Sequence, residues 1–415
     1  MPGVFPNAPA LILPSDPEES SMTPIWNRRR PNASLTDAPL LVAVLGFALV
    51  LCLWPALAPA QSDAELINRW RAEWPRTEFS RASINLWEIT SGGPPKDGIP
   101  PIDHPKFVST TQAASWLGEM EPVLMFRHGG DVRAYPLQIL IWHEIVNDTV
   151  GGMPITATFC PLCNSILAFD RRVGDRVLDF GTTGKLRKSD LVMWDRQTES
   201  WWQQLTGEAI VGELTGTRLK MLPAPLISFR TFRESFPKGR VLSRETGHSR
   251  NYGANPYAGY DNLANEQPFL FKQKVDRRLK AMERVVVLEL GKEAKAYPYS
   301  ELAKVGLVND TLEGTPLVVI YAKGIRSALD RSSIRDSREV GTGAVYGRKV
   351  AGRVLTFARQ DGLVMDKETG SRWNLLGQAE AGPLKGEQLP TLVHGNHFAF
   401  AWLAFRPQSA IYAAP

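Results

Sequence analysis

Cysteine and concentrated charge are scarce in this sequence. Only three of its 415 residues are cysteine, at positions 52, 160 and 163. Because no second Cys-x-x-Cys pair accompanies Cys160 and Cys163, a zinc ribbon is excluded. Asn164, directly after Cys163, excludes the c-type haem attachment pattern, which requires histidine at that position.

Several other signatures are missing. The net charge is +5, and the basic surplus is spread along the chain, which argues against nucleic acid as a partner. The glycines and hydroxyls of residues 181–196 lack the order of a P-loop, and no nucleotide fingerprint or Ser-His-Asp spacing is found. The usual nucleotide-binding and serine hydrolase classes are therefore not indicated.

The length and composition predict a strand-rich protein of more than one folded unit. A chain of 415 residues, 43% of them hydrophobic, is longer than one core usually supports. Its 31 prolines and 34 glycines fit a protein rich in loops and strands better than a helical bundle.

Residues 1–60 are interpreted as a signal peptide. Three arginines at 28–30 precede an apolar run at 40–53, and small residues lead to an expected cleavage after Ala60. Met22 offers an internal start, which would leave residues 1–21 untranslated. An uncleaved anchor is the alternative, but the apolar run is shorter than the ~20 residues of a spanning helix. We expect an exported protein, periplasmic or extracellular, that does not span the membrane after cleavage.

The chain contains an internal repeat. "VLMFRHGGDVRAYPLQILIWHEIVNDTVGGMPITATFC" aligns without a gap with "VVVLELGKEAKAYPYSELAKVGLVNDTLEGTPLVVIYA", at a shift of 162 residues. A later match, at a shift of 171, places Asp195 and Trp202 against Asp366 and Trp373. We interpret the repeat as a tandem duplication.

The repeat sets the expected domain boundaries. Copy one is predicted at 121–247 and copy two at 281–415, with a linker at 248–280 and an extended Gly/Pro-rich strap with short helices at 61–120. Alternating apolar residues on either side of turn signals such as Gly129-Gly130 predict hairpins in both copies. One or two helices are predicted in each copy, and in copy one they are expected at 136–145 and 225–237. The predicted fold class is α+β, predominantly antiparallel β, in two tandem related domains.

The second copy serves as a control for the first. Residues needed by the fold should survive in both copies, whereas residues needed for chemistry need survive in only one. Four polar or reactive residues of copy one are absent from copy two. They are His143, Glu144, Cys160 and Cys163, which face Val305, Gly306, Ala322 and Ile325. Their joint loss predicts one site, and drift of a degenerate copy is the alternative.

The pair Cys160 and Cys163 has three interpretations. A Cys-Pro-x-Cys turn at a helix N-terminus would lower the pKa of Cys160 and suit thiol-disulfide redox chemistry. Two thiolates with His143 as third ligand would suit a metal ion, copper first and zinc second. A disulfide in an exported protein would be a structural link, although its small loop makes it a weak one.

Further residues are candidates for a pocket beside the pair. Glu144 is one, and Arg187, Lys188 and Ser189 lack clear counterparts in copy two. His394 and His397 flank Gly395-Asn396 before an aromatic segment, which we interpret as helix entry and packing.

Five segments, "GGPPKDGIPPID", "WHEIVND", "TFCPLCNS", "GTTGKLRKSDLVMWDRQTESWW" and "NPYAGYDN", resemble the exported prokaryotic family known as domain of unknown function 3179. The resemblance covers roughly residues 92–407 and brings no established activity. It implies that His143, Glu144, Cys160 and Cys163 match motif positions of the family. Copy two departs from them, which implies a role as scaffold or partner surface.

The sequence therefore predicts one Cys-x-x-Cys/His site for metal handling or thiol-disulfide redox. The expected partner is a small molecule, a metal or a protein thiol. The alternative is a non-catalytic binding module, in which aromatic-rich grooves hold a peptide or glycan and the cysteines form a structural disulfide.

Overall fold

The computed structural model describes residues 63–415, of which Ile67–Pro415 form one compact unit. The predicted signal peptide, its cleavage after Ala60 and the start at Met22 lie outside the described residues. With 39% strand and 13% helix, most strands antiparallel, the chain has the predicted α+β class. Within the described residues, no helix is long and apolar enough to cross a membrane.

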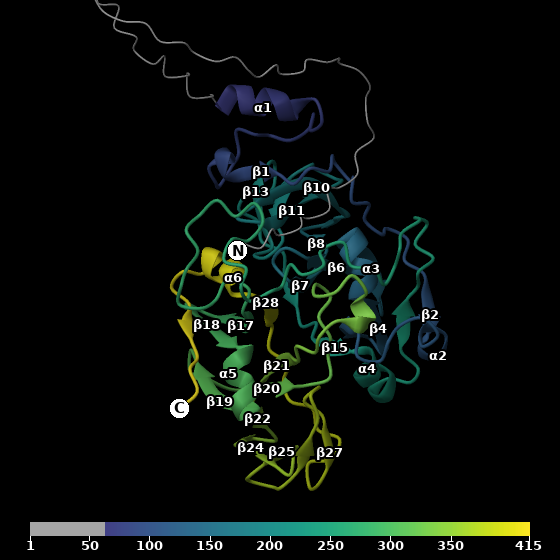
Figure 1. Ribbon diagram of the computed structural model, residues 1–415, viewed down its shortest axis with the longest axis vertical. Coiled ribbons are helices and arrows are strands. Elements are labelled where there is room, and N and C mark those ends of the chain that lie inside the picture. The colour runs from purple at the N-terminus through teal and green to yellow at the C-terminus, as the bar shows by residue number, and fades with distance from the viewer. Residues whose placement is uncertain (1–62) are drawn as a thin grey trace, which may run out of the picture. The chain divides into compact units, whose positions relative to one another are not determined.

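Residues 121–247, here called the first half, contribute to three sheets (Figure 1). One has the order β15 (Leu226–Ser228), β3 (Pro122–His128), β4 (Asp131–Pro136), β16 (Arg240–Leu242) and β2 (Phe107–Ser109). The next has the order β14 (Met221–Leu222), β7 (Ser165–Asp170), β6 (Met153–Cys160) and β5 (Ile145–Val150). The third has the order β1 (Ile89–Ser91), β10 (Phe180–Arg187), β11 (Asp190–Asp195), β12 (Trp201–Gln203) and β13 (Glu208–Val211).

Residues 281–415, here called the second half, also contribute to three main sheets. One has the order β28 (Gly395–Phe398), β17 (Arg284–Leu290), β18 (Glu293–Pro298) and β29 (Ala410–Ile411). The others are β19 (Leu307–Leu312), β20 (Thr315–Ala322) and β21 (Thr342–Gly347), and then β24 (Phe357–Gln360), β25 (Leu363–Asp366), β26 (Arg372–Trp373) and β27 (Ala379–Ala381). Each half also has a small hairpin, β8 (Arg172–Val173) with β9 (Arg176–Val177) and β22 (Lys349–Val350) with β23 (Arg353–Val354).

The helices are short. The first half contains α3 (Leu137–His143) and α4 (Phe229–Ser235), and the second contains α5 (Tyr299–Val305) and α6 (Ala399–Phe405). Before the first half come α1 (Asp63–Arg71), a 3-10 turn at Leu86–Glu88 and α2 (Thr110–Ala113), and a second 3-10 turn lies at Ile334–Asp336. The predicted helical segment at 225–237 begins as strand β15 and becomes helical only from Phe229.

The two halves have the same order of elements and the same strand pairing. β3–β4–α3–β5–β6–β7 corresponds to β17–β18–α5–β19–β20–β21, and β10–β13 to β24–β27. Each half ends in a strand, a helix and a last strand that pairs in parallel, β16 with β4 and β29 with β18. The residues shared by the two halves therefore occupy equivalent places in the fold.

Shared polar contacts explain why several residues recur. Tyr135 donates to Asp148 at 2.6 Å, and Tyr297 donates to Asp310 at 2.8 Å. Trp202 donates to Asp195 at 2.9 Å, and in the second half Trp373 donates to Asp366 at the same distance. A buried carboxylate needs such donors, because leaving it unpaired is costly.

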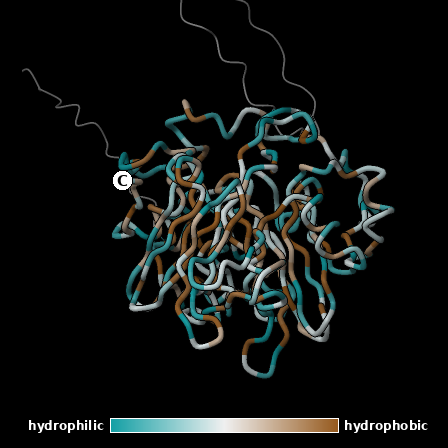
Figure 2. Tube along the Cα trace, turned by 90° about the horizontal axis from the view of Figure 1, so that it is seen from below, coloured by the Kyte–Doolittle hydropathy of each residue, from teal (hydrophilic) through white to brown (hydrophobic). Residues whose placement is uncertain are grey.

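The main hydrophobic core is common to both halves. It takes Phe159 and Phe169 from the first half and Phe398 and Phe400 from the second. Strand β28 contacts β7, so the second half lies directly against the sheet that carries Cys160. Figure 2 shows hydrophobic stretches in the interior and a largely hydrophilic outer trace. Burial of each such phenylalanine contributes about 1.5–3 kcal/mol, so each half depends on the other for stability.

Candidate functional site

The Cys-Pro-Leu-Cys segment is the turn of the β6–β7 hairpin. Cys160 ends β6 and pairs with Ser165 at the start of β7, and residues 161–164 form the turn between them. Asn164 closes the turn with a φ of 48°, which asparagine tolerates better than most residues, and its amide donates to the Pro161 carbonyl at 3.2 Å. The predicted helix N-terminus at Cys160 is wrong, because a strand follows the turn.

Both cysteines are buried, and they are not linked to each other. Cys160 and Cys163 lie 4.0 Å apart as free thiols, so this structure does not contain the disulfide of the binding-module alternative. The burial follows from β6, whose last six residues are buried on both faces. The Cys163 thiol donates to the carbonyl of Ser189 at 3.3 Å.

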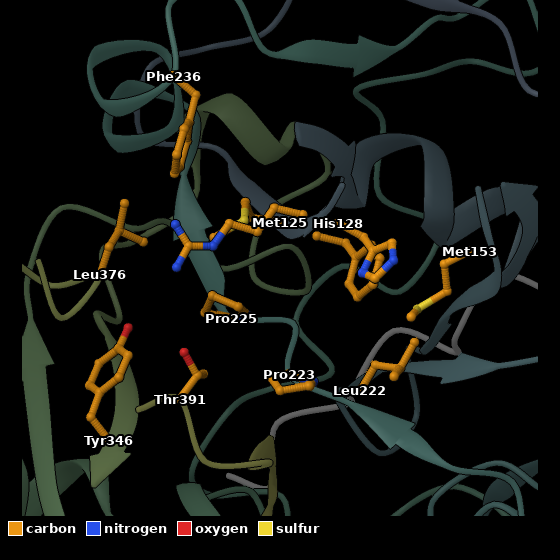
Figure 3. A pocket seen from close by; sticks show the side chains of 12 residues that line it. Met125, His128, Met153, Leu222, Pro223, Pro225, Phe236, Tyr346, Leu376 and Thr391 are labelled. Carbon is orange, nitrogen blue, oxygen red and sulfur yellow. The ribbon is translucent and has the colours of Figure 1, made fainter. Parts of the chain in front are cut away.

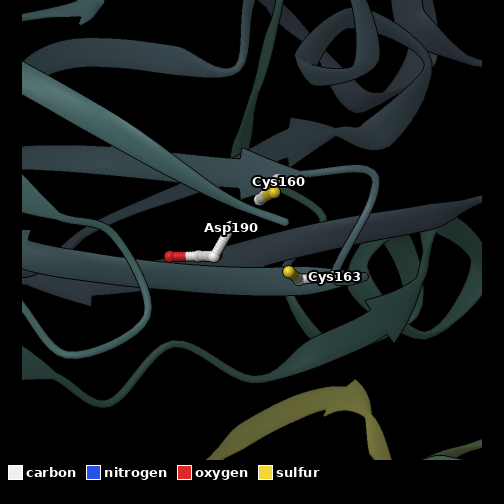
Figure 4. Close-up of side chains that lie close together, drawn as sticks. All are labelled: Cys160, Cys163 and Asp190. Carbon is white, nitrogen blue, oxygen red and sulfur yellow. The ribbon is translucent and has the colours of Figure 1, made fainter. Parts of the chain in front are cut away.

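Asp190 lies beside the two thiols (Figure 4). The β10–β11 hairpin brings it there through a two-residue turn, Lys188 and Ser189, with φ values of 54° and 65°. The ligand atoms of Asp190, Cys160 and Cys163 all lie within 4.8 Å of one another. These three residues therefore form the cluster that we call the Cys/Asp site.

The two carboxylate oxygens of Asp190 differ in their hydrogen bonds. Oδ2 accepts from Nε2 of Gln203 at 2.6 Å and from the amide of Leu205 at 3.0 Å. Oδ1 is buried and makes no hydrogen bond of ordinary geometry among the described residues, although both thiols act as weak donors that oppose the rise in the pKa of Asp190. A buried carboxylate oxygen with only weak thiol donors beside it is a site that a cation would stabilise.

Burial controls the ionisation of the site. It raises the pKa of Asp190 to about 6, and it raises the pKa of the Cys160 thiol. The pKa of Cys163 is raised well above its usual value by burial and then by Cys160. The metal-free site therefore keeps its thiols protonated, which opposes the activated thiolate of the redox interpretation.

Glu144 lies next to the Cys/Asp site. It ends α3 in the left-handed conformation, with a φ of 57°, and its side chain is buried. Burial, and then the charge of Asp190, raise the pKa of Glu144 to about 8. The charge of Glu144 in turn contributes to the raised pKa of Cys160, which places the two groups close together.

His143 is directed to other partners. Its Nδ1 lies 2.7 Å from the carbonyl of Pro100, and its Nε2 lies 2.7 Å from the hydroxyl of Tyr252. Burial lowers the pKa of His143 to about 4. The third group beside the two sulfurs is therefore the carboxylate of Asp190, and His143 is outside the cluster.

Of the predicted pocket residues, Glu144 lies next to the Cys/Asp site and Ser189 adjoins it through its contact with Cys163. Arg187 pairs with Glu88 at 2.8 Å. Lys188 donates to the carbonyl of Ala404 at 2.9 Å. The Ser189 hydroxyl donates to the carbonyl of Phe269 at 2.5 Å, which ties the linker to this corner.

The linker and the second half cover the site. Tyr257 is close enough to Glu144 and Cys160 for their charges to raise its pKa further above the value that burial sets. Burial also raises the pKa of Tyr260, and the charge of Cys163 adds to the shift. From the second half, the amide of Phe398 donates to the carbonyl of Cys163 at 2.9 Å.

A separate pocket of about 210 Å³ lies between the halves (Figure 3). Met125 and Met153 line it from the first half, and Tyr346 and Leu376 line it from the second. Its lining contains none of the residues of the Cys/Asp site.

Asp190 is the functional candidate that sequence reasoning missed. At the shift of 171 residues it aligns with Asp361, so comparing the copies did not single it out. In the structure, Asp361 lies in the turn of the shorter β24–β25 hairpin, whereas the longer β10–β11 hairpin carries Asp190 to the cysteines. The difference in length between the β10–β11 and β24–β25 hairpins is the feature that distinguishes Asp190 from Asp361, and an alignment without gaps does not show it.

Comparison with the curated proteins finds no match, and comparison with the solved structures finds none either. A family model matches residues 96–409, which include the last part of the strap, the Cys/Asp site and nearly all of both halves. The chain thus belongs to the family described as protein of unknown function (DUF3179).

Proposed function

We propose that this protein binds a single metal ion at Cys160, Cys163 and Asp190, with zinc preferred to copper. The observation that carries the proposal is the cluster itself, two buried thiols and a carboxylate oxygen within 4.8 Å of one another. These three groups leave the fourth position of a tetrahedral zinc ion to a water molecule or to the carboxyl group of Glu144, which lies next to the site.

The spacing of the sulfurs supports metal binding. Two sulfurs bound at about 2.3 Å to one tetrahedral zinc ion lie about 3.8 Å apart. The separation of 4.0 Å between Cys160 and Cys163 is close to that value. In a disulfide the sulfurs would be about 2.05 Å apart.

The carboxylate of Asp190 determines which metal ion the site would prefer. Copper(I) prefers thiolate, thioether and imidazole ligands, whereas zinc also accepts carboxylate oxygen. With His143 bonded elsewhere and Asp190 in its place, zinc fits the donors better than copper does. Binding would release the thiol protons and compensate the buried Oδ1 of Asp190.

Metal analysis of the whole chain, expressed with its leader in a bacterial host and purified without chelator, tests the proposal. We expect about one zinc ion per chain, lost in Cys163→Ser and in Asp190→Asn. Glu213→Gln, which removes only an exposed ion pair with Arg176, should retain the zinc. If the wild-type protein holds no metal and takes up none on zinc addition, the proposal is wrong.

Thiol-disulfide exchange is the second candidate, and the proximity of the two sulfurs favours it. Closing the bond needs the sulfurs to approach by about 2 Å, which side-chain rotation within one turn can supply. Thiol titration after equilibration with glutathione buffers distinguishes the two functions. A metal-free protein that cycles reversibly between two thiols and none would support exchange.

Two broader proposals accompany this function. The matching order, pairing and buried contacts of the halves support their origin by tandem duplication, with the metal site kept in one copy. The arginines, apolar run and small residues before Ala60 support export. N-terminal sequencing of the secreted protein tests the second of these.

A further inference from the structure

His394 and His397 are two buried histidines of the second half, and each has one ring nitrogen without a hydrogen-bond partner among the described residues. They are 5% and 2% exposed, and both line a cavity of about 230 Å³ beside β17 and α6. Nε2 of His394 and Nδ1 of His397 are buried and have no hydrogen-bond partner within residues 63–415. Since water does not reach these nitrogens, their desolvation is uncompensated.

The protonation of His394 follows from its one hydrogen bond. Its Nδ1 lies 2.8 Å from the carbonyl of Leu392. A carbonyl can only accept, so Nδ1 carries the hydrogen and Nε2 presents a bare lone pair. Histidines that bind metals are usually fixed in this way, with one ring nitrogen donating to a backbone carbonyl and the other facing the ion.

The first half shows that the fold does not need histidine at these positions. His397 pairs with Val285 of β17, and its equivalent Ile227 pairs with Val123 of β3. Three residues earlier in each half stand His394 and Ala224. Both Ala224 and Ile227 are buried, so apolar side chains fill the same places without unpaired nitrogens.

The two rings are close enough to interact. Burial, and then the charge that His394 would carry, lower the pKa of His397 to about 3. Burial also lowers the pKa of His394. Both imidazoles are therefore neutral at physiological pH, the form in which histidine binds metals.

We propose that His394 and His397 form a second metal site, which binds copper(I) through the two imidazole nitrogens. Imidazole suits copper and zinc among the common metals. Zinc requires about four ligands, and the other ionisable side chains that line the cavity, Glu289, Arg218 and Arg406, supply only one more donor. Because Glu289 is already paired with Arg406 at 2.7 Å, an ion of low coordination number fits best.

This site is independent of the Cys/Asp site in its ligands, although the two are neighbours. Phe398, which follows His397, donates its amide to the carbonyl of Cys163. The test therefore removes the thiols first. In a Cys160→Ser, Cys163→Ser background, anaerobic titration with copper(I) against a chromophoric chelator should give about one bound ion per chain.

The matched variant exchanges each histidine for the residue of the first half, His394→Ala with His397→Ile. It should fold at least as stably, and its copper(I) affinity should fall by at least about 100-fold. Unchanged affinity, or no copper(I) binding in the parent background, would overturn the proposal.

A measurement on the unsubstituted protein guards against misfolding of the serine background. With ¹⁵N-labelled histidine, the Nε2 resonance of His394 should shift on addition of copper(I), while that of exposed His104 should not. A His394 resonance that is indifferent to copper(I) would contradict the proposal, whatever the Cys/Asp site binds.

Discussion

Glu144 and Gly306 end equivalent helices, α3 and α5, in the same unusual backbone conformation, with φ values of 57° and 75°. Glycine adopts this conformation without strain, whereas a residue with a Cβ atom does not. The first half thus accepts backbone strain at Glu144 and places a buried carboxyl group beside the Cys/Asp site.

Replacing Glu144 with the glycine of the second half should stabilise the metal-free protein. Relief of the left-handed strain is worth about 1 kcal/mol, and removal of a buried carboxyl group adds to it. Urea unfolding of Glu144→Gly and wild-type protein measures the difference. The reverse change, Gly306→Glu, should destabilise, because a Cβ at Gly306 would lie 2.3 Å from Nε of Arg359. A Glu144→Gly variant less stable than wild type would contradict the interpretation.

The stability of the metal-free protein should fall as pH rises from about 4.5 to 8. The pKa of Glu144 is about 8 in the folded state, against an ordinary value of 4.5 for an exposed glutamate, so over this range the folded state binds more protons than the unfolded state. Unfolding free energy then decreases with pH. Between these pH values, the unfolding free energy of wild type should fall by on the order of a few kcal/mol more than that of Glu144→Gln. Denaturant titrations of both proteins at pH 5 and pH 8 measure the difference. An equal change in unfolding free energy in the two proteins would contradict the prediction.

Zinc should stabilise the wild-type protein, and Asp190→Asn should abolish that effect. A ligand that binds only the folded state at 100 times its Kd adds about 2.7 kcal/mol. The asparagine oxygen can still accept from Gln203 and Leu205, so the metal-free variant should fold normally. Thermal unfolding with and without zinc measures both effects. An equal shift in Tm for both proteins would remove Asp190 from the site.

Tyrosine-to-phenylalanine changes in the two halves should have similar structural costs. Tyr135→Phe removes a donor from buried Asp148, and Tyr297→Phe does the same for Asp310, so each should cost about 1–3 kcal/mol. Neither should change the zinc content, since both residues belong to the repeated framework. Calorimetry and metal analysis of the same samples provide the two readouts, and loss of zinc in Tyr135→Phe would show that the framework and the site are coupled.

Local patterns predicted much of the fold. Gly129 and Gly130 between two alternating runs predicted the β3–β4 hairpin, and both have positive φ there. The segment 136–145 predicted a short helix, which is α3. Such elements follow from the spacing of neighbouring residues, which the sequence displays directly.

The partners within the site were beyond sequence reasoning. Asp190 reaches Cys163 because one hairpin is longer than its counterpart, and His143 turns away because the strap offers it the carbonyl of Pro100. Both arrangements depend on how segments distant in the sequence pack together. The turn after Cys160 differs, because there the local sequence is ambiguous: Cys-Pro-x-Cys is compatible with a helix start and with a hairpin. The pairing of Cys160 with Ser165 selects the hairpin.

The hydrogen bond from Phe398 to Cys163 joins residues that are far apart in the chain. During synthesis the ribosome must deliver Phe398 long after it has delivered the cysteines. A nascent or prematurely terminated product would lack β28, so both sulfurs would be exposed on that side to oxidants and to other thiols. The two thiols are therefore fully buried only once translation is complete.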